Sequence, residues 1–165
     1  MAKTKKTQAI RLLESKGIDH RVTTYDASGE LHSGEEAAAL VGAPPDSVYK
    51  TLVVVREGSP GKPMLVMIPV ADQLDLKVIA TAVGEKKVRM ATQREAERLT
   101  GLQVGGISAL ALTGRNFEVL IDNHAKSLER IHVSAGARGI DVDLAVEDLV
   151  ALTGARYVKL VHTHE

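Results

Sequence analysis

A lysine beside a run of apolar residues is the first feature of this chain that could do chemistry. Lys50 and Thr51 directly precede the apolar run Leu52–Val55, whose β-branched residues are typical of a strand covered on both faces. Lysine is rarely buried without a partner, so the Lys50 amine is expected to point into a cleft or along a sheet edge. The alternative is a lysine that protects an edge strand from aggregation, and this segment alone does not decide between the two.

Two segments rich in glycine and small polar residues could bring the backbone close to a ligand. They cover residues 101–108, which include Gly105 and Gly106, and residues 133–139. Glycine permits close approach, and successive N–H groups can be directed at a carbonyl or phosphate oxygen. Tight turns between strands would explain the same glycines without a ligand. Neither segment has dinucleotide-binding or P-loop spacing, so the sequence does not support a nucleotide-hydrolysing enzyme.

The familiar catalytic constellations are missing from the sequence. It contains no G-x-S-x-G or H-E-x-x-H motif, and with no cysteine it offers no thiol nucleophile, disulfide or thiolate zinc site. His162 and His164 form a close pair on an expected frayed tail, where a metal site is disfavoured. Four aspartates stand at expected element ends, where capping explains a carboxylate without catalysis: Asp72, Asp75, Asp122 and Asp141.

Composition points to an ordinary globular protein that does not bind duplex nucleic acid through its own charge. The 165 residues predict a single domain spanning 1–165, and 21 basic residues balance 21 acidic ones. Aromatic residues make up only 2%, which leaves few rings for stacking on bases. No apolar run approaches the length that spans a bilayer, and no secretory segment follows the basic start of the chain. The sequence therefore predicts a cytoplasmic protein that binds neither membrane nor DNA.

Helical and strand patterns alternate along the chain. Helices are expected at about 4–16, from the capping box Ser33–Glu36 to Gly42, at 75–83, from the capping box Thr92–Glu95 to Gly101, and at about 145–153. Strands are expected at His20–Thr24, Thr51–Val55, Met64–Ile68, Lys87–Met90, Glu118–Asp122, Arg130–Val133 and Tyr157–Val161. The loop at 58–61 should join two antiparallel neighbours, and several connections are too short for a crossover helix. The pattern favours an α+β fold with a mixed sheet, flat or curled, and helices around it.

Taken together, these motifs resemble the YbaK/EbsC/ProX family of aminoacyl-tRNA deacylases over nearly the whole chain. Five segments carry the resemblance in the right order: Val48–Leu52, Pro69–Lys77, Lys86–Ala91, Val104–Ser108 and Val133–Asp141. The resemblance implies a mixed, barrel-like sheet flanked by helices and an editing enzyme without a cofactor. Such enzymes remove a wrongly attached amino acid, typically Cys or Ala, from the 3′ end of proline tRNA. Prolyl-tRNA synthetase is the implied protein partner.

The resemblance also assigns site residues. The implied catalytic residues are Lys50, Gly105 and Gly106, and the implied substrate-binding residues are Tyr25, Thr51, Ile107, Ser134 and Asp141. One position departs from the family pattern: cysteine-specific bacterial members often carry an aromatic residue where this chain has Ser33, preceded by His32.

The residues suit a reaction in which the substrate supplies the nucleophile. No Ser-His pair or metal site is evident, whereas the thiol of an attached cysteine can attack its own carbonyl with an effective molarity on the order of 10⁵ M or more. Backbone N–H groups near Gly105 and Gly106 could stabilise the oxyanion, and Lys50 could hold the carbonyl or the terminal phosphate. Three alternatives stay open: an Ala-tRNA(Pro) deacylase that uses water, a non-catalytic tRNA-end binding module associated with a synthetase, and, ranked last, a small-molecule esterase.

Overall fold

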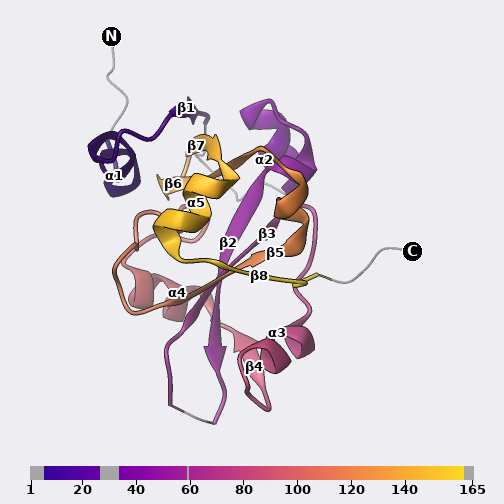
Figure 1. Cartoon of the computed structure of the whole chain (residues 1–165). Coiled ribbons are helices and arrows are strands. Elements are labelled where there is room, and N and C mark those ends of the chain that lie inside the picture. The colour runs from indigo at the N-terminus through magenta and orange to yellow at the C-terminus, as the bar shows by residue number, and fades with distance from the viewer. Residues whose placement is uncertain (1–5, 27–33, 59, 162–165) are drawn as a thin grey trace.

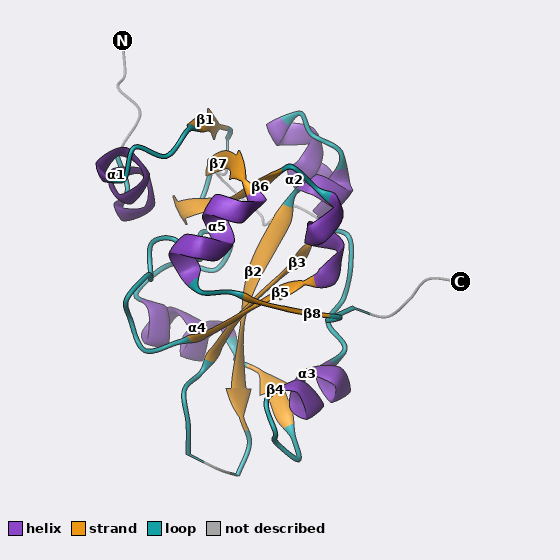
Figure 2. Ribbon diagram, in the orientation of Figure 1, coloured by secondary structure: helices purple, strands orange, loops and turns teal. Residues whose placement is uncertain are grey.

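The computed structural model describes residues 6–26, 34–58 and 60–161. Its helices are α1 (Gln8–Ser15), α2 (Gly34–Val41), α3 (Leu76–Ala82), α4 (Gln93–Thr100) and α5 (Val146–Thr153), with short 3₁₀ helices η1 (Pro45–Ser47) and η2 (Asn123–Ser127). Its strands are β1 (His20–Thr24), β2 (Tyr49–Arg56), β3 (Met64–Pro69), β4 (Val88–Met90), β5 (Glu118–Asp122), β6 (Arg130–Ala137), β7 (Ile140–Ala145) and β8 (Arg156–Val158) (Figures 1 and 2).

The strands form two sheets with helices around them. The smaller sheet is antiparallel, in the order β1-β7-β6, and the larger has the order β4-β2-β3-β5-β8. The larger sheet is mixed, because β2 pairs antiparallel with β3 and β4 whereas β5 pairs parallel with β3 and β8. An isolated parallel bridge between Val48 and His132 links β6 to the chain entering β2. The expected α+β fold with a mixed sheet is confirmed, as is the antiparallel pairing across the loop at 58–61.

Local signals set several helix starts where the sequence predicts them. The Thr92 side chain accepts from the Glu95 N–H while the Glu95 carboxylate accepts from the Thr92 N–H, which confirms this capping box. The Asp75 carboxylate caps α3, and Asp122 caps η2 by accepting from the His124 N–H at 3.0 Å. Ser33 of the other expected capping box lies outside the described residues.

The seventh strand corrects the sequence analysis. β7 was not expected, and Asp141 lies inside it rather than at a capping position. Its residues alternate between apolar and acidic from Ile140 to Leu144, the two-residue period of a strand with one polar face. β6 is also longer than expected, because it continues past Val133 to Ala137 and pairs with β7 around a bulge. β8 is shorter than expected and ends at Val158.

Lys50 is a half-buried residue of β2, a strand that begins at Tyr49 and lies between β4 and β3 in the larger sheet. β4 pairs only with Val54–Arg56, so near Lys50 the neighbour on the side away from β3 is β6, through the bridge between Val48 and His132. Full burial of Leu52–Val55 was too strong an expectation, because only Val53 and Val54 are fully covered. These two side chains belong to different apolar clusters on opposite faces of the strand. The strand buried throughout is β3.

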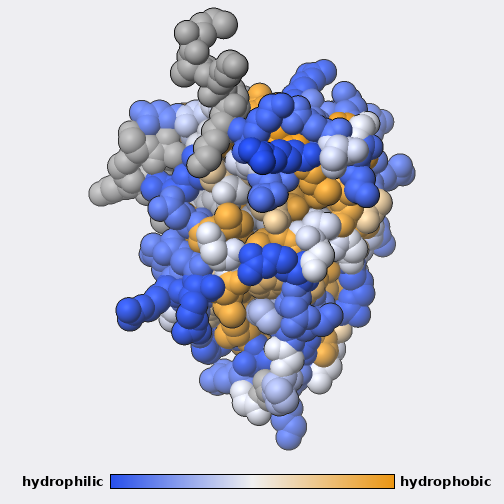
Figure 3. Space-filling model, turned by 90° about the vertical axis from the view of Figure 1, so that its left-hand side faces the viewer, coloured by the Kyte–Doolittle hydropathy of each residue, from blue (hydrophilic) through white to orange (hydrophobic). Residues whose placement is uncertain are grey.

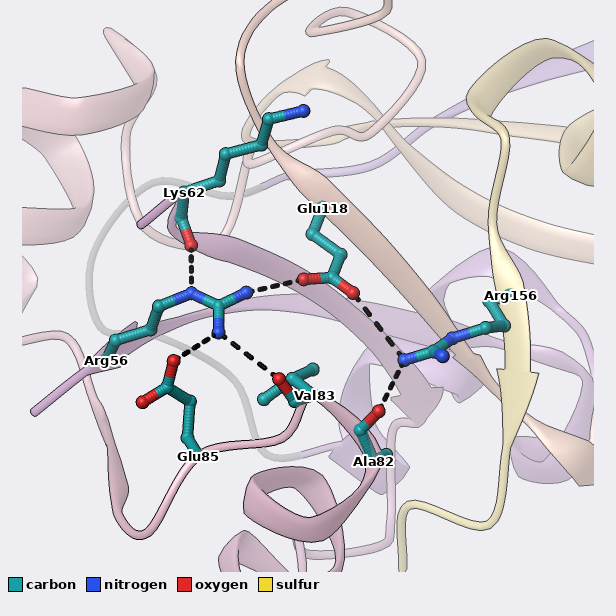
Figure 4. A network of polar contacts seen from close by, with 7 residues as sticks. All are labelled: Arg56, Lys62, Ala82, Val83, Glu85, Glu118 and Arg156. Carbon is teal, nitrogen blue, oxygen red and sulfur yellow. Dashed lines mark hydrogen bonds and ion pairs between the residues drawn. The ribbon is translucent and has the colours of Figure 1, made fainter. Parts of the chain in front are cut away.

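A polar network ties the far end of β2 to three other elements (Figure 4). The Arg56 side chain is 12% exposed and contacts Glu85 at 2.8 Å and Glu118 at 2.7 Å. Arg156 on β8 lies 3.5 Å from the second oxygen of Glu118 and donates to the Ala82 carbonyl at 2.8 Å. The network therefore holds β2, β5, β8 and the end of α3 together.

The face seen from the side of α1 and α4 carries many hydrophilic residues, with hydrophobic residues visible between them (Figure 3). None of the helices in the described ranges has the length and apolar character needed to cross a membrane.

Candidate functional site

One face of the smaller sheet carries polar side chains in register. Ser134 on β6 lies directly opposite Asp141 on β7, and Asp141 lies opposite Thr23 on β1. Directly opposed residues project from the same face of a sheet, so these three side chains form a row across the three strands. The other face carries apolar residues such as Val133 and Val142, which lie in the main core.

Lys50 extends this row from the larger sheet. The bridge between Val48 and His132 sets the offset between β2 and β6, and Lys50 and Ser134 each lie two residues beyond it. Burial lowers the pKa of the Lys50 amine, while the nearby Asp72 carboxylate acts in the opposite direction. A partly desolvated ammonium group therefore stands beside the row.

Asp141 is the most deeply buried ionisable group of the row. It is 8% exposed, and no residue in the described ranges donates a hydrogen bond to its carboxylate. Burial raises the pKa of the Asp141 carboxyl to about 6. Burial and the Asp141 charge both raise the pKa of the Tyr25 phenol, whereas Arg138 opposes this effect, so these three groups lie within electrostatic reach of one another. An uncompensated buried carboxylate is well suited to bind a cationic group.

Ser134 is oriented by its own hairpin. The Gly136 N–H donates to the Ser134 hydroxyl oxygen at 3.1 Å, which leaves the hydroxyl proton available to another acceptor. Ser134 is the last paired residue before the bulge that ends at Ala137, and Gly136 lies inside the bulge, so the bulge orients the serine side chain.

The two glycine-rich segments pack against each other. A Cβ on Gly106 would lie 2.7 Å from the Arg138 nitrogen and 2.8 Å from the Ala137 carbonyl carbon, so only glycine fits beside this hairpin turn. The Gly106 N–H donates to the Gln103 carbonyl at 2.8 Å and is therefore engaged within its own loop. The preceding Gly105 has a φ of +91°, and none of the described residues accepts from its N–H.

α4 positions this loop. The Glu97 carboxylate accepts from the Val104 N–H at 2.9 Å, and the Thr100 hydroxyl accepts from the Leu102 N–H at 3.1 Å. Both donors lie directly ahead of Gly105, so the helix end holds the loop against the turn between β6 and β7.

Two of the predicted site residues lie apart from the row. Thr51 shares a face of β2 with Tyr49 and Val53, which pack into the main core, because side chains alternate along a strand. Ile107 is 4% exposed and belongs to the same core. The structure thus places Ser134 opposite Asp141 with Tyr25 within electrostatic reach, and it places Lys50 level with Ser134 by strand register. Ile107 lies in the core, and Thr51 is half-buried on the face of β2 that carries core residues.

Sequence reasoning missed several groups around the site. Thr23 and Arg138 were not assigned, and neither was His132, whose Nδ1 is buried without a hydrogen-bond partner in the described chain. The alternation of Asp141 and Asp143 with apolar residues is the signal that could have revealed β7 and hence the row.

No cluster of three metal-ligating side chains occurs within the residues that the structure describes. His162 and His164 lie outside those residues. A separate open hollow is lined by Pro63, Leu99, Arg115, Asn116 and Phe117, none of which is a predicted site residue.

Comparison with known proteins identifies the family. The family described as aminoacyl-tRNA editing domain matches residues 29–152, which include Lys50, both glycine-rich segments, Ser134 and Asp141. The chain belongs to this aminoacyl-tRNA editing domain family. A protein of Enterococcus faecalis, EbsC, whose name carries the provisional assignment Cys-tRNA(Pro)/Cys-tRNA(Cys) deacylase, is 33% identical over 97% of this chain and 98% of its own length.

Two further members of the editing family show a similar relationship. The multifunctional Ser/Thr-tRNA deacylase ProXp-y of Escherichia coli K12 is 32% identical over 59% of this chain and 58% of its own length. A crystal structure described as a provisional trans-editing enzyme for prolyl tRNA synthetase matches with a TM-score of 0.81 and 25% identity, covering 99% of this chain and 100% of that one. The editing-domain fold of this chain therefore extends beyond the matched 29–152.

Proposed function

We propose that this protein is a trans-acting editing deacylase that removes a wrongly attached amino acid, most favourably Cys, from tRNA(Pro) in the cytoplasm. The observation that carries the proposal is the row of Lys50, Ser134 and Asp141, in which an ammonium, a hydroxyl and a buried carboxylate share one face. Family membership and the likeness to EbsC support the same class of reaction.

The row offers a partner for each polar group of an aminoacyl ester. The Asp141 carboxylate would bind the α-ammonium group of the amino acid, because a buried, unpaired carboxylate gains most from a cation. Lys50 would hold the ester carbonyl or the terminal phosphate as a point charge, and the free proton of the Ser134 hydroxyl would be donated to substrate oxygen. Tyr25 would close the side of the pocket next to Asp141.

The nucleophile would come from the substrate. The sulfur of the attached cysteine forms a bond to its own carbonyl carbon, the ester C–O bond breaks, and the thiol proton passes to the departing ribose oxygen. The products are the tRNA with a free hydroxyl and a cyclic thiolactone. An oriented intramolecular attack of this kind needs no serine or cysteine from the protein.

The loop at Gly105 would stabilise the oxyanion formed during this attack. The Gly105 N–H has no acceptor among the described residues, whereas the Gly106 N–H is held by the Gln103 carbonyl. We therefore assign the donor role to Gly105 and the packing role to Gly106. One well-placed donor accounts for about 3 kcal/mol of transition-state stabilisation in comparable sites.

Other amino acids and a non-catalytic role are the competing proposals. An Ala ester would require water as the nucleophile, and the likeness to ProXp-y adds Ser and Thr as candidate amino acids. A tRNA-end binding module would use the same row without turnover. A protein with a net charge of zero has little electrostatic attraction for tRNA, which suits a protein whose partner binds the tRNA. We therefore propose prolyl-tRNA synthetase as that partner.

Deacylation of Cys-, Ala- and Ser-tRNA(Pro) by the wild-type protein and Lys50→Ala tests the proposal. Lys77→Ala is the matched control, because Lys77 is an exposed lysine on α3. We expect the wild-type protein to release cysteine. The deacylation rate of Lys50→Ala should fall at least 100-fold, which corresponds to a barrier increase on the order of a few kcal/mol, and the rate of Lys77→Ala should not change.

A thiol-blocked ester separates the two mechanisms. S-methylcysteinyl-tRNA(Pro) differs from the substrate by one methyl group on sulfur and cannot form a thiolactone, so we expect it to resist the enzyme. Equal cleavage of the blocked and free esters would favour water, and cleavage of no ester would favour the binding module.

A further inference from the structure

The first strand lies beyond the matched family residues and yet borders the proposed pocket. The match begins at residue 29, whereas β1 covers His20–Thr24. β1 pairs with β7 along its whole length, which places Thr23 directly opposite Asp141. Thr23 is half-buried, while Val22 and Thr24 on either side are exposed. The Thr23 side chain is therefore the one that β1 turns toward the row at this point.

Asp141 needs a group that fixes its carboxylate. No described residue donates a hydrogen bond to it, although it is 8% exposed. Directly opposed side chains have Cβ atoms about 4.5–5.5 Å apart, within reach of a hydroxyl donating to a carboxylate. The structure shows no hydrogen bond between Thr23 and Asp141, so the inference requires the threonine side chain to rotate about χ1 toward the carboxylate.

The remaining groups facing Asp141 have other tasks. Tyr25 and Arg138 approach from the hairpin end, and Ser134 and Lys50 lie on the β6 and β2 sides. The Ser134 hydroxyl accepts from the Gly136 N–H, and the proposed function assigns its proton to a substrate oxygen. Thr23 is thus the neutral donor on the opposite side of Asp141 from Ser134.

We propose that Thr23 is a positioning residue for deacylation: its hydroxyl donates a hydrogen bond to the Asp141 carboxylate and fixes it toward the α-ammonium group of the substrate. This inference rests on the proposed function, which assigns Asp141 to that ammonium group. It extends the pocket to a strand outside the matched family residues.

The kinetic test compares identical substitutions at neighbouring positions. Thr23→Val removes the hydroxyl but keeps the β-branched shape, Thr23→Ser restores the hydroxyl, and Thr24→Val is the control at an exposed residue opposite Ile140. We expect Thr23→Val to lower kcat/KM by about tenfold, the typical effect of losing a hydrogen bond to a charged group. Thr23→Ser and Thr24→Val should stay within about twofold of wild type. Equal kcat/KM in the two valine variants would overturn the proposal.

A titration tests the same inference without any turnover. Carbon-13 NMR of the Asp141 carboxyl should give a higher pKa in Thr23→Val than in wild type, because the lost hydrogen bond stabilises the ionised form. Thr24→Val and Thr23→Ser should leave this pKa unchanged. An unchanged pKa in Thr23→Val would reject the positioning role even if no ester is cleaved, whereas inactive wild-type protein alone would reject only the proposed function. Thr23→Ala provides the same comparison if valine is not accommodated.

Discussion

Lys50 and Thr51 are consecutive in the sequence but project from opposite faces of β2. Lys50 shares its face with Val48 and lies toward the row of Ser134 and Asp141. Thr51 shares its face with Val53 in the main core. The sequence motif therefore combines one residue of the proposed site with one residue that supports the strand.

This arrangement predicts different effects for two adjacent substitutions. Lys50→Ala should reduce deacylation by at least about 100-fold, whereas Thr51→Val should leave kcat/KM within about threefold because valine fills the same packing position. Both variants should unfold within about 1.5 kcal/mol of wild type in urea. A large kinetic defect in Thr51→Val with normal stability would place Thr51 in contact with substrate.

The Asp141 carboxyl predicts an acid limb in the pH profile. Its pKa is raised to about 6, and only the ionised form can bind the substrate ammonium group. We expect kcat/KM to fall as the pH drops through about 6, and we expect this limb to be absent in the residual activity of Asp141→Asn. The substrate thiol also titrates, so the comparison should include the Ala ester. If the acid limb persists in Asp141→Asn, the limb belongs to a group other than Asp141.

The buried Asp141 carboxylate is also predicted to lower the stability of the folded protein at neutral pH. Because burial raises the pKa of Asp141 in the folded state, the protein is favoured when the carboxyl is protonated, and this stabilisation is lost as the pH rises through about 6. Asp141→Asn should therefore raise the free energy of unfolding at pH 7.5 by about 2–3 kcal/mol and have little effect near pH 3.5. Urea unfolding at both pH values measures the difference. A destabilised Asp141→Asn at pH 7.5 would mean that the carboxylate has a cationic partner.

Close packing of the two glycine-rich segments predicts that Gly106→Ala is harmful. The added methyl group would meet backbone atoms of Ala137 and Arg138, so one segment must shift at a cost of about 1–3 kcal/mol. The shift should also lower kcat/KM of the folded protein, because the same hairpin positions Ser134. Gly114→Ala is the control, since its Cβ would meet open space and only its φ of +84° is unfavourable. Equal activity of the two variants would show that the contact between Gly106 and the hairpin does not affect the site.

The network around Arg56 predicts a large contribution to stability. Arg56→Met removes the ion pairs to Glu85 and Glu118, which are 18% and 31% exposed, and should cost about 2–3 kcal/mol. Lys87→Met is the control: its ion pair with Glu57 spans 3.7 Å between a 74% exposed and a 43% exposed side chain, and should contribute under about 0.5 kcal/mol. Denaturant unfolding measures both. Similar losses would show that Arg56 acts as a surface charge.

Features with local causes were predictable from the sequence. The capping box of Thr92 and Glu95 and the cap from Asp75 need only residues three apart or fewer, and both are present. The central apolar strand was recognised from its composition. Family motifs indicated Lys50 and Asp141 as candidate site residues, although they did not reveal which faces these side chains occupy.

Features that depend on distant pairing were not predictable. β7 follows β6 after a turn at Arg138 and Gly139, and the bulge before that turn sets which residue lies opposite Asp141. A shift of one residue would move Ser134 to the other face of the sheet. The neighbourhood of Lys50 likewise depends on the bridge between Val48 and His132, which no short motif encodes.

The order of the strands also has a consequence during protein synthesis. β1 is an edge strand whose pairing partner in the described structure, β7, leaves the ribosome only after the strands β2 to β6. Until then β1 is an unpaired segment of the nascent chain, and its His20, Arg21 and Thr24 side chains make it a poor template for aggregation. Since Thr23 and Asp141 meet only when β1 and β7 pair, the complete pocket can form only after β7 has been synthesised.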